Sequence, residues 1–306
     1  MKIYYGPDDK SLASQKRALA IGVFDGVHLG HQKILSHMIV DAKKHNIPSM
    51  VVTFDPHPAK VLAPKKFQPS ILMSLEHRLS FFASLGIQET LVIPFTMDFS
   101  KITREDFFIQ LLIQKLGLQS LSVGRDFHFG HKGLGSASFL KDKCKMFHRR
   151  FFMVPALKSA GTVISSTRIR VLIEKGDLKK ASEMLGRPVS VVGTVEHGHG
   201  RGKSIGFPTA NLNPHHEALP PAGVYAANGY LEKKKLRGVI SIGPKPTFGD
   251  SNKGLEVHFL KFNQNIYGRK IELLFVKRLR DIQRFATPEL LGKAIARDIK
   301  SAQKIL

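Results

Sequence analysis

The stretch Gly22-Val23-Phe24-Asp25-Gly26-Val27-His28-Leu29-Gly30-His31 decides the fold of the first part of the chain. It lies between an apolar run at residues 18–23 and a segment, residues 29–45, whose apolar side chains recur at helical spacing. Glycines let the backbone approach a ligand closely, and a helix start offers unpaired N–H groups to phosphate. His28 and His31 are three residues apart, so both imidazoles can face one ligand. The stretch predicts a phosphate-binding turn; metal ligation or helix capping by the histidines are the alternatives.

Strand and helix patterns continue to alternate after this stretch. Further buried strands are predicted at residues 50–54, 91–94, 120–123 and 151–154. Helices are predicted at residues 76–85 and 107–116, followed by a connection made of helices at residues 169–176 and 177–185. Such alternation indicates a parallel sheet covered by helices, in a Rossmann-like α/β domain. Ligands bind beyond the carboxyl ends of the strands of these sheets, where residues 22–31 fall.

The pattern changes from Pro188 onward. Closely spaced strands are predicted at residues 189–195, 224–231, 236–242, 256–262 and 270–276. A closing helix is predicted at residues 289–305, with Thr287 as its N-cap and Pro288 at its first position. Many strands with one late helix indicate a small β-barrel. We therefore predict two domains, residues 1–186 and 187–306.

The composition is that of a globular protein of more than one core, because 306 residues exceed a typical domain. Cys144 is the single cysteine and has no partner for an internal disulfide, which favours the reducing cytoplasm. No secretory signal is expected at the start, and no run of about 18 apolar residues occurs. The sequence therefore predicts a cytoplasmic protein without a membrane segment.

The net charge of +23 predicts anionic ligands, with 47 Lys and Arg against 24 Asp and Glu. Residues 187–306 hold 20 of these basic and 9 of these acidic residues, so the excess is spread over both halves of the chain. Polyphosphate substrates fit this charge, and RNA or DNA binding is the alternative. We expect no nucleic-acid partner, because no recognition motif is found and Trp is absent. The oligomeric state is not determined by these features.

Further motifs occur at separate places in the first domain. They are Thr53-Phe54-Asp55-Pro56-His57-Pro58, Val123-Gly124-Arg125-Asp126-Phe127-His128-Phe129-Gly130 and Ile164-Ser165-Ser166-Thr167-Arg168-Ile169-Arg170. Together with residues 22–31 they resemble the motifs of the bacterial bifunctional riboflavin kinase/FAD synthetase family. The first domain of that family is a nucleotidyltransferase. The resemblance extends over nearly the whole chain.

This resemblance implies that the first domain transfers the adenylyl group of ATP to FMN, giving FAD and pyrophosphate. His28 and His31 would be catalytic, and both would contact the triphosphate. The other residues implied in ATP binding are Gly22, Phe24, Asp25, Gly30, Ser165, Thr167 and Arg170. Asp126 and Phe129 are implied in flavin binding, with loop structure and core packing as the alternative reading. After Gly130 the family usually has a basic residue and then Gly-Asp, whereas this chain has Gly133-Leu134-Gly135-Ser136.

A second phosphate-binding segment is predicted at residues 193–211, which are rich in glycine and basic residues and end in Pro208-Thr209-Ala210-Asn211. It is not a P-loop, because the helix that follows a P-loop is missing. It resembles the flap and the Pro-Thr-Ala-Asn motif of riboflavin kinases. The residues this implies in ATP binding are Gly198, Lys203, Gly206, Thr209 and Asn211. Thr209 and Asn211 are also the predicted Mg²⁺ ligands, since both carry hard oxygen donors.

Glu256 and Arg280 complete the predicted kinase site. Glu256 stands where the family has its catalytic base, which would accept the proton of the ribityl 5′-hydroxyl as that group attacks the γ-phosphorus of ATP. A solvent-facing strand glutamate is the alternative. Arg280 is implied in contact with the flavin or its phosphate. Ser241, Lys261 and Ile282 stand where the family commonly has asparagine, aspartate and glutamate.

The predicted function is bifunctional flavin-cofactor synthesis. ATP phosphorylates riboflavin to FMN in the second domain and adenylylates FMN to FAD in the first, with Mg²⁺ as cofactor. Alternatively, only the nucleotidyl-transfer domain is active, on a pantetheine or nicotinamide phosphate. Glu256 and the Pro-Thr-Ala-Asn segment argue against that alternative, because such an enzyme would not need them.

Overall fold

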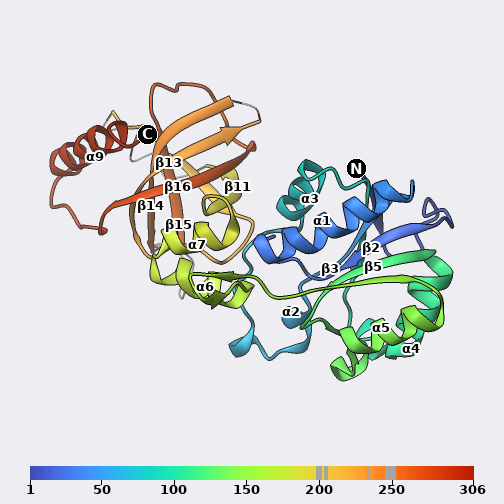
Figure 1. Cartoon of the computed structure of the whole chain (residues 1–306). Coiled ribbons are helices and arrows are strands. Elements are labelled where there is room, and N and C mark those ends of the chain that lie inside the picture. Colours follow the sequence, from blue (N-terminus) through green and yellow to red (C-terminus); the bar gives the residue numbers. More distant parts are fainter. Residues whose placement is uncertain (198–201, 203–205, 233, 245–252) are drawn as a thin grey trace. The chain divides into compact units, whose positions relative to one another are not determined.

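The computed structural model describes residues 1–197, 202, 206–232, 234–244 and 253–306 (Figure 1). Its contacts divide the chain into two compact units, Met1–Ile71 with Leu75–Ser166, and Leu72–Ser74 with Thr167–Leu306. The connecting helices are therefore grouped with the second unit. The domain boundary at residues 186 and 187 stays a prediction.

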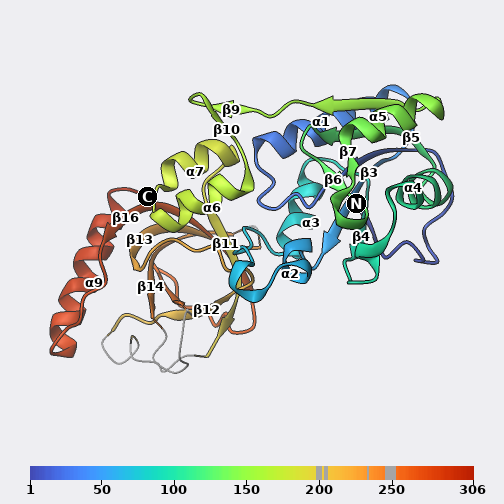
Figure 2. The same ribbon diagram turned by 90° about the horizontal axis from the view of Figure 1, so that it is seen from below.

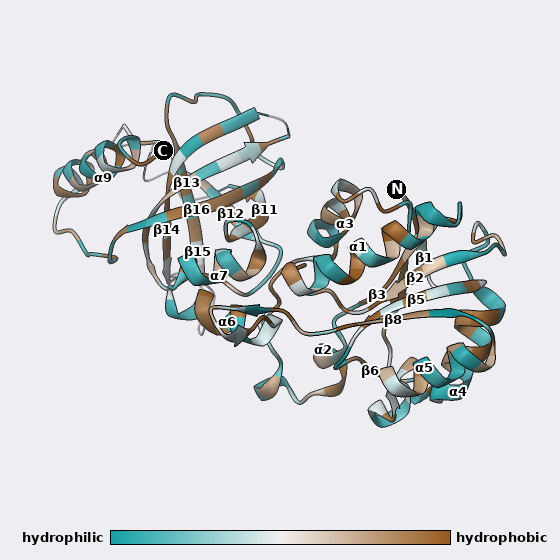
Figure 3. Ribbon diagram, viewed as in Figure 1, coloured by the Kyte–Doolittle hydropathy of each residue, from teal (hydrophilic) through white to brown (hydrophobic). Residues whose placement is uncertain are grey.

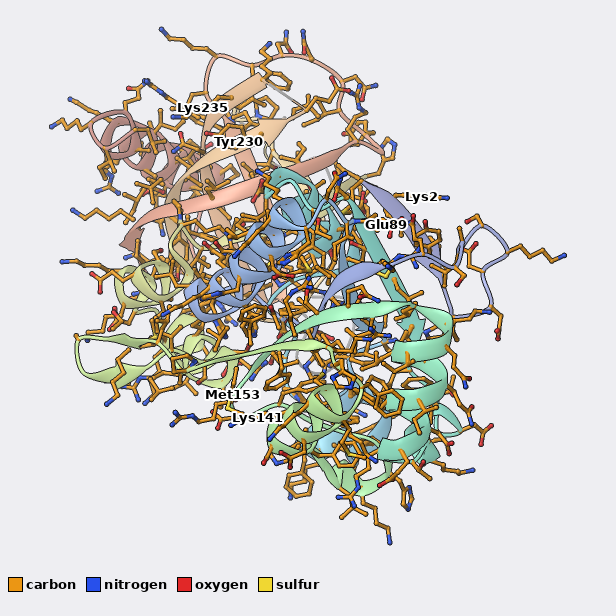
Figure 4. The ribbon with its side chains drawn as sticks, turned by 45° about the vertical axis from the view of Figure 1, so that its right-hand side comes forward. Lys2, Glu89, Lys141, Met153, Tyr230 and Lys235 are labelled. Carbon is orange, nitrogen blue, oxygen red and sulfur yellow. The ribbon has the colours of Figure 1, made fainter. Side chains whose placement is uncertain are left out.

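The first unit is built on a six-stranded sheet with the strand order β1-β4-β3-β2-β5-β8, in which all neighbouring strands are parallel (Figure 1). The strands are β1 Lys2–Tyr5, β2 Arg17–Ile21, β3 Ser49–Asp55, β4 Glu89–Pro94, β5 Leu118–Gly124 and β8 Arg150–Val154. The predicted α/β class is confirmed. Strand β1 was not predicted; its register against β4 sets Lys2 opposite Glu89, and Figure 4 labels both residues.

Helices pack on this sheet through apolar faces. The longer ones are α1 Leu29–Lys44, α3 Leu75–Ser84, the π-helical η3 Phe107–Lys115 and α5 Ala137–Met146. The shorter elements are α2 Pro58–Leu62, η1 Lys65–Phe67, η2 Phe99–Lys101, α4 Arg104–Asp106, η4 His131–Gly133, β6 His128–Phe129, β7 Gly135–Ser136, β9 Lys158–Ser159 and β10 Thr162–Val163. Phe107, Phe108 and Leu112 of η3 share one core cluster with Leu19 and Val52 of the sheet. Burial of these side chains from water stabilises the layers.

The strand order places a topological switch point at β2. From β2 the chain runs through α1 to β3 and on to β4, and it then returns past β2 to pair β5 on the other side. In open α/β sheets the ligand crevice lies outside the carboxyl ends of the two strands where the order reverses. Residues 22–31 follow β2, and the segment that starts at Arg125 follows β5. The topology thus directs both loops to the predicted crevice.

The second unit contains a closed antiparallel barrel with the strand order β11-β12-β15-β14-β13-β16 (Figure 2). Its strands are β11 Ser190–Glu196, β12 Ala210–Pro214, β13 Gly223–Leu231, β14 Lys234–Pro244, β15 Lys253–Phe259 and β16 Lys270–Arg280. The helices are α6 Ser166–Lys175, α7 Leu178–Leu185 and α9 Pro288–Gln303. The predicted barrel and closing helix are confirmed, and β12 is a strand that was not predicted.

Helix α9 begins as its sequence predicts. The side chain of Thr287 accepts a hydrogen bond from the Leu290 N–H, and Pro288 occupies the first turn. Polar and apolar residues alternate along the helix (Figure 3), and its apolar face packs on β13 and β14 through Ala302, Val224 and Val239. Among the described residues, no helix is both long enough and apolar enough to cross a membrane.

Candidate active sites

Residues 22–31, here called the nucleotide loop, include several residues with positive φ angles. Phe24, Gly26 and Val27 have φ values of +55°, +79° and +36°, in the region that disfavours residues with a Cβ. A Cβ at Gly22 would lie 3.1 Å from the Phe24 ring, and one at Gly30 would lie 3.1 Å from the His28 ring. The two glycines therefore let aromatic rings pack directly on the loop backbone.

The two histidines of the loop stack on each other, with ring centroids 3.6 Å apart. Nδ1 of His28 accepts a hydrogen bond from the His31 N–H at 3.2 Å, so His28 is the N-cap of α1. The capping alternative is therefore correct for His28. Because Nδ1 accepts, the proton of a neutral His28 lies on Nε2. Nε2–H is thus oriented as a donor by the cap itself.

His31 is an imidazole held in its neutral form. Burial lowers its pKa well below the usual 6.5, and the adjacent His28 and Arg78 lower it further. Its Nδ1 is buried without a hydrogen-bond partner among the described residues. A buried polar atom without a partner is costly, and a bound phosphate oxygen would relieve that cost.

A cavity of about 270 Å³ opens beside the nucleotide loop. Six of the predicted ATP-site residues line it together: Gly22, Phe24, Asp25, His28, Gly30 and His31. Ser165 does not line this cavity, but its neighbour Ser166 does, and the Ser166 hydroxyl donates to the Asp25 carbonyl at 2.8 Å. Thr167 and Arg170 belong to the second unit. Their predicted contact with ATP stays a prediction.

The same cavity is lined by residues that sequence reasoning did not select, among them His57 and Arg125. Nδ1 of His57 accepts from the Ala59 N–H at 3.1 Å and caps α2, at whose first position Pro58 stands. The Pro58 position was a usable signal for a helix start. Arg125 stands in the motif of residues 123–130, directly after β5, but its side chain was not selected as a site residue.

A second, more apolar cavity of about 670 Å³ adjoins the first. Aromatic and aliphatic side chains predominate in its lining, including Phe54, Phe95, Phe99, Phe107, Phe127, Phe129, Leu62 and Met97. Val23, Asp126 and Phe127 line both cavities, so the two share a wall. The predicted flavin residues Asp126 and Phe129 thus lie at one apolar chamber. Asp126 is exposed at its junction with the cavity of the nucleotide loop.

Phe129 also packs as a core residue, which was its alternative reading. It is 7% exposed, and its ring stacks on Phe127 with centroids 5.6 Å apart. Gly135 lies against this ring, since a Cβ there would come within 2.6 Å of it. Ser136, at the departure from the family pattern, caps α5 by accepting from the Phe139 N–H at 3.2 Å. Although this segment departs from the family pattern, Ser136 provides a side chain that caps helix α5.

In the barrel, the predicted kinase residues form a row across neighbouring strands. Asn211 of β12 is the register partner of Glu196 on one side and of Glu256 on the other, and Glu256 is in turn opposite Ser241. Directly opposite side chains share a face of the sheet, with Cβ atoms about 4.5–5.5 Å apart. Leu255 and Val257 point into the barrel core, which leaves Glu256 exposed on the outer face. The predicted base and a predicted metal ligand are thus neighbours on the outer face.

Thr209 is held beside this row by its neighbours in the chain. The Pro208 carbonyl forms a hydrogen bond of 2.8 Å with Nδ1 of His258 on β15. A Cβ at Gly202 would lie 2.4 Å from the Phe207 carbonyl oxygen and 3.0 Å from Thr209 Oγ1, so only glycine fits there. Thr209 lines a cavity of about 120 Å³. Gly202 therefore lies directly against the start of the Pro-Thr-Ala-Asn motif.

The remaining predicted ATP residues of the barrel are placed only in part. Gly198 and Lys203 lie outside the described residues. Gly206 has a φ of +82°, a conformation that suits glycine, and among the described residues no atom is found within 4 Å of the place a Cβ would take. At the start of the glycine-rich segment, His197 stacks on Tyr267, which also lines the 120 Å³ cavity.

Arg280 points at the closing helix. Its Nε and Nη2 contact the carboxylate of Asp298 on α9 at 2.8–3.1 Å, and its Nη1 donates to the Asp281 carbonyl at 2.9 Å. This guanidinium therefore joins the end of β16 to α9. Its predicted flavin contact would come in addition to this pair and stays a prediction.

The residues present fit a magnesium–nucleotide complex in the barrel. Mg²⁺ is usually held by one or two protein oxygens together with substrate phosphates. Thr209 and Asn211 are half-buried and offer such oxygens, and Asn211 is the register partner of Glu256. The described part of the chain contains no group of three or more His, Cys, Asp or Glu side chains that could hold a metal ion. The donor set therefore suits a metal that arrives with its nucleotide.

Comparison with known proteins gives matches for both parts of the chain. A family model described as FAD synthetase matches residues 10–168, and one described as riboflavin kinase matches residues 185–306. A protein of Buchnera aphidicola subsp. Schizaphis graminum named bifunctional riboflavin kinase/FMN adenylyltransferase is 35% identical over 99% of this chain and 98% of its own length. The protein of that name from Escherichia coli K12 is 35% identical over 99% and 97%.

Among solved structures, one titled as a macrolide-efflux protein from Streptococcus pneumoniae has a TM-score of 0.85 to this chain. The two are 28% identical and each is covered over 99% of its length. The fold of the whole chain is therefore shared with a solved structure.

Proposed function

The chain belongs to the family of bifunctional riboflavin kinases/FMN adenylyltransferases, and from that premise we propose that it makes FMN from riboflavin and FAD from FMN. The observation that carries the proposal is the pair of separate polar sites, one at the nucleotide loop and one around Asn211 and Glu256. Each site matches the reaction of its own domain. The protein uses ATP in both reactions.

In the first domain, a phosphate oxygen of FMN attacks the α-phosphorus of ATP, and pyrophosphate leaves. The apolar chamber with Phe129 takes the flavin rings, and the cavity of the nucleotide loop takes ATP. Their shared wall at Asp126 brings the flavin phosphate to the triphosphate. Nε2–H of His28 and the ring of His31 supply hydrogen bonds to the charge that develops on the phosphates. The α1 start adds unpaired backbone amides.

In the second domain, the ribityl 5′-hydroxyl of riboflavin attacks the γ-phosphorus of ATP, and ADP leaves. The Glu256 carboxylate accepts the proton of that hydroxyl. Thr209 and Asn211 would hold Mg²⁺, which would neutralise charge on the ATP phosphates. The register of β12 against β15 places Asn211 beside Glu256, so the base lies next to the phosphate-binding side chains. A cytoplasmic location belongs to the same proposal and rests on the single, unpaired cysteine.

The direct test is incubation of the purified chain with riboflavin, ATP and Mg²⁺, followed by separation of riboflavin, FMN and FAD. We expect FMN to appear first and FAD after it. A folded sample that leaves riboflavin unchanged and also leaves added FMN unchanged would reject both activities.

The two sites are then separated with point variants. His31→Asn together with His28→Asn should abolish FAD formation while FMN formation continues. Asn is chosen at position 28 because it is a good N-cap, so α1 keeps its cap while the imidazole is lost. Glu256→Gln should reduce FMN formation by about 10²–10⁴-fold and leave adenylylation of added FMN intact. Loss of both activities in either folded variant would contradict independent sites.

A further inference from the structure

Arg78 is a buried arginine that neither the sequence motifs nor the cavities single out. It lies in α3, only 3% exposed, and its guanidinium faces the ends of β2 and β3. Nη1 donates to the Val23 carbonyl at 2.7 Å and to Thr53 Oγ1 at 2.9 Å. The Thr53 hydroxyl, itself fully buried, also donates to the Val23 carbonyl at 3.1 Å. One guanidinium thus fixes the second carbonyl after the end of β2, that of Val23.

The same guanidinium also binds the second strand end. Nη2 donates to the Phe54 carbonyl and to Asp55 Oδ1, both at 3.3 Å. Val23 and Asp55 belong to the two motifs that border the predicted nucleotide site, residues 22–31 and 53–58. Arg78 therefore links the two motifs from behind, without lining the cavity itself.

Helix α3 supports the nucleotide loop at a second point, one turn further on. The Phe24 ring packs edge to face on Phe82, with centroids 5.9 Å apart, and on His31 at 5.3 Å. Phe24 and Val27 have positive φ values although neither is glycine. Such conformations persist only where surrounding contacts over-determine them. Phe82 supplies such a contact to the Phe24 ring, and Arg78 holds the carbonyl of Val23, the residue before it.

The positive charge of Arg78 also affects the nucleotide loop, through the pKa of His31. Burial lowers the pKa of Arg78, and the neighbouring Asp25 and Asp55 oppose that shift. An arginine side chain stays charged in proteins, so a cation is kept behind the loop. That cation helps to lower the pKa of His31, after burial and the neighbouring His28. The loop therefore presents a neutral imidazole beside a fixed backbone.

We propose that Arg78 is a positioning residue for adenylyl transfer: it holds the nucleotide loop, through the Val23 carbonyl and the end of β3, in the geometry that aligns His28 and His31 with the triphosphate. The proposal rests on the proposed function of the first domain. It requires that loss of the guanidinium lowers turnover in molecules that are still folded. A displacement of about 1 Å at a reacting centre costs about 10²-fold in rate.

The test compares Arg78→Met and Arg78→Lys with the control Arg17→Met. Arg17 is also fully buried and bonds to a carboxylate, with its Nε 2.6 Å from Glu89 Oε2, but it lies at the amino end of β2. For each variant we would measure kcat and KM of FAD synthesis from added FMN, and kcat of riboflavin phosphorylation in the same sample. The second activity reports the amount of active second domain in the sample, and thermal unfolding followed by circular dichroism reports whether the first domain is folded.

Arg78→Met should lower kcat of FAD synthesis by about 10- to 100-fold, with riboflavin phosphorylation unchanged. Arg78→Lys, which keeps the charge but not the two-sided contact, should recover part of that kcat. Arg17→Met should lower thermal stability and leave kcat per folded molecule at the wild-type value.

Wild-type kcat in folded Arg78→Met would overturn the positioning role, as would an equal kcat loss in Arg17→Met. If Arg78→Met does not fold, Arg78→Lys decides alone: a wild-type kcat overturns the proposal, and a lowered kcat at unchanged riboflavin phosphorylation supports it. Absence of FAD formation in the wild-type protein would instead reject the proposed function of the domain.

Discussion

The pair between Arg280 and Asp298 gives the sharpest stability prediction, because it joins the barrel to its closing helix. The Asp298 carboxylate receives Nε and Nη2 of Arg280 at 2.8–3.1 Å. The perturbation is Asp298→Asn, which keeps the side-chain shape and removes the charge. Arg280 then keeps one acceptor and faces an amide in place of the second oxygen.

The magnitude follows from the burial of the two side chains. Breaking a fully buried ion pair costs about 3–5 kcal/mol, because a charge is left without its partner. The Asp298 side chain is 8% exposed, but that of Arg280 is 22% exposed and can be rehydrated in part. We therefore expect a loss of about 2 kcal/mol, between the values for buried and surface pairs. With a urea m-value of about 2 kcal/mol/M, the unfolding midpoint of the barrel should fall by about 1 M.

Urea unfolding monitored by riboflavin kinase activity and by far-UV circular dichroism measures this loss. The control is Asp281→Asn, since Asp281 pairs with Arg278 but is 80% exposed, and it should change the midpoint little. The double change Arg280→Met with Asp298→Leu should restore most of the stability, because no charge is then left buried. Equal midpoints for Asp298→Asn and the control would refute the reasoning. A raised KM for riboflavin in the stable double variant would show that Arg280 also binds the flavin.

Three further predictions concern the first domain. Gly135→Ala would set a methyl group 2.6 Å from the Phe129 ring; the forced shift of the ring should cost about 1–3 kcal/mol and raise KM for FMN, measured against unchanged riboflavin phosphorylation. Burial raises the pKa of the Cys144 thiol to about 12, so iodoacetamide at pH 8 should label the protein only after unfolding, and labelling of the native protein would contradict that burial. His31 has a folded-state pKa well below 6.5, so it reduces stability as pH falls below 6.5, at up to about 1.4 kcal/mol per pH unit until the folded-state pKa is reached. The variant His31→Gln should therefore lose less free energy of unfolding than the wild type between pH 7.5 and 5.5, and parallel curves would contradict the lowered pKa.

Elements with strong local signals were predicted from the sequence. Helix α9 carries its own N-cap, Thr287, followed by Pro288, and both act as expected. The strand and helix on either side of the nucleotide loop were predicted within two residues, because a buried strand reads as an apolar run and α1 has apolar side chains at helical spacing.

The elements that were missed depend on pairing with distant segments. Strand β1 has four residues, and its partner β4 lies more than 80 residues away. Strand β12, Ala210–Pro214, has Leu212 as its one large apolar residue, so its sequence gives no clear strand signal. It is held in place by pairing with β11 and β15. Helix α5 was missed because its interior carries three lysines around a few apolar residues. In each of these the stabilising contact is tertiary, and local propensity does not report it.

The same limit applies to the sites. His28, His31 and Gly30 could be selected because their spacing within one turn carries the chemistry. Arg78 could not, because its role comes from a contact with a carbonyl group 55 residues away in sequence. Ser166 stands in the motif of residues 164–170, but its hydrogen bond to the Asp25 carbonyl, 141 residues away, could not be predicted. Residues expected to contact a ligand can be found from motifs in the sequence. Residues that hold those motifs in place from distant segments are found from the structure.

The different chemistry of the two sites follows from the two attacking groups. A phosphate monoester such as that of FMN has a second pKa near 6, so its oxygen is already ionised at neutral pH and needs no base. In the proposed reaction the nucleotide loop accordingly offers two imidazoles as donors to phosphate oxygens: His28, which caps α1, and His31, whose pKa burial lowers. A ribityl hydroxyl must lose its proton as it attacks, and Glu256, the register partner of Asn211, is the base proposed for that step. Exchange of the two arrangements would leave one site without a base and the other with an added negative charge next to a triphosphate.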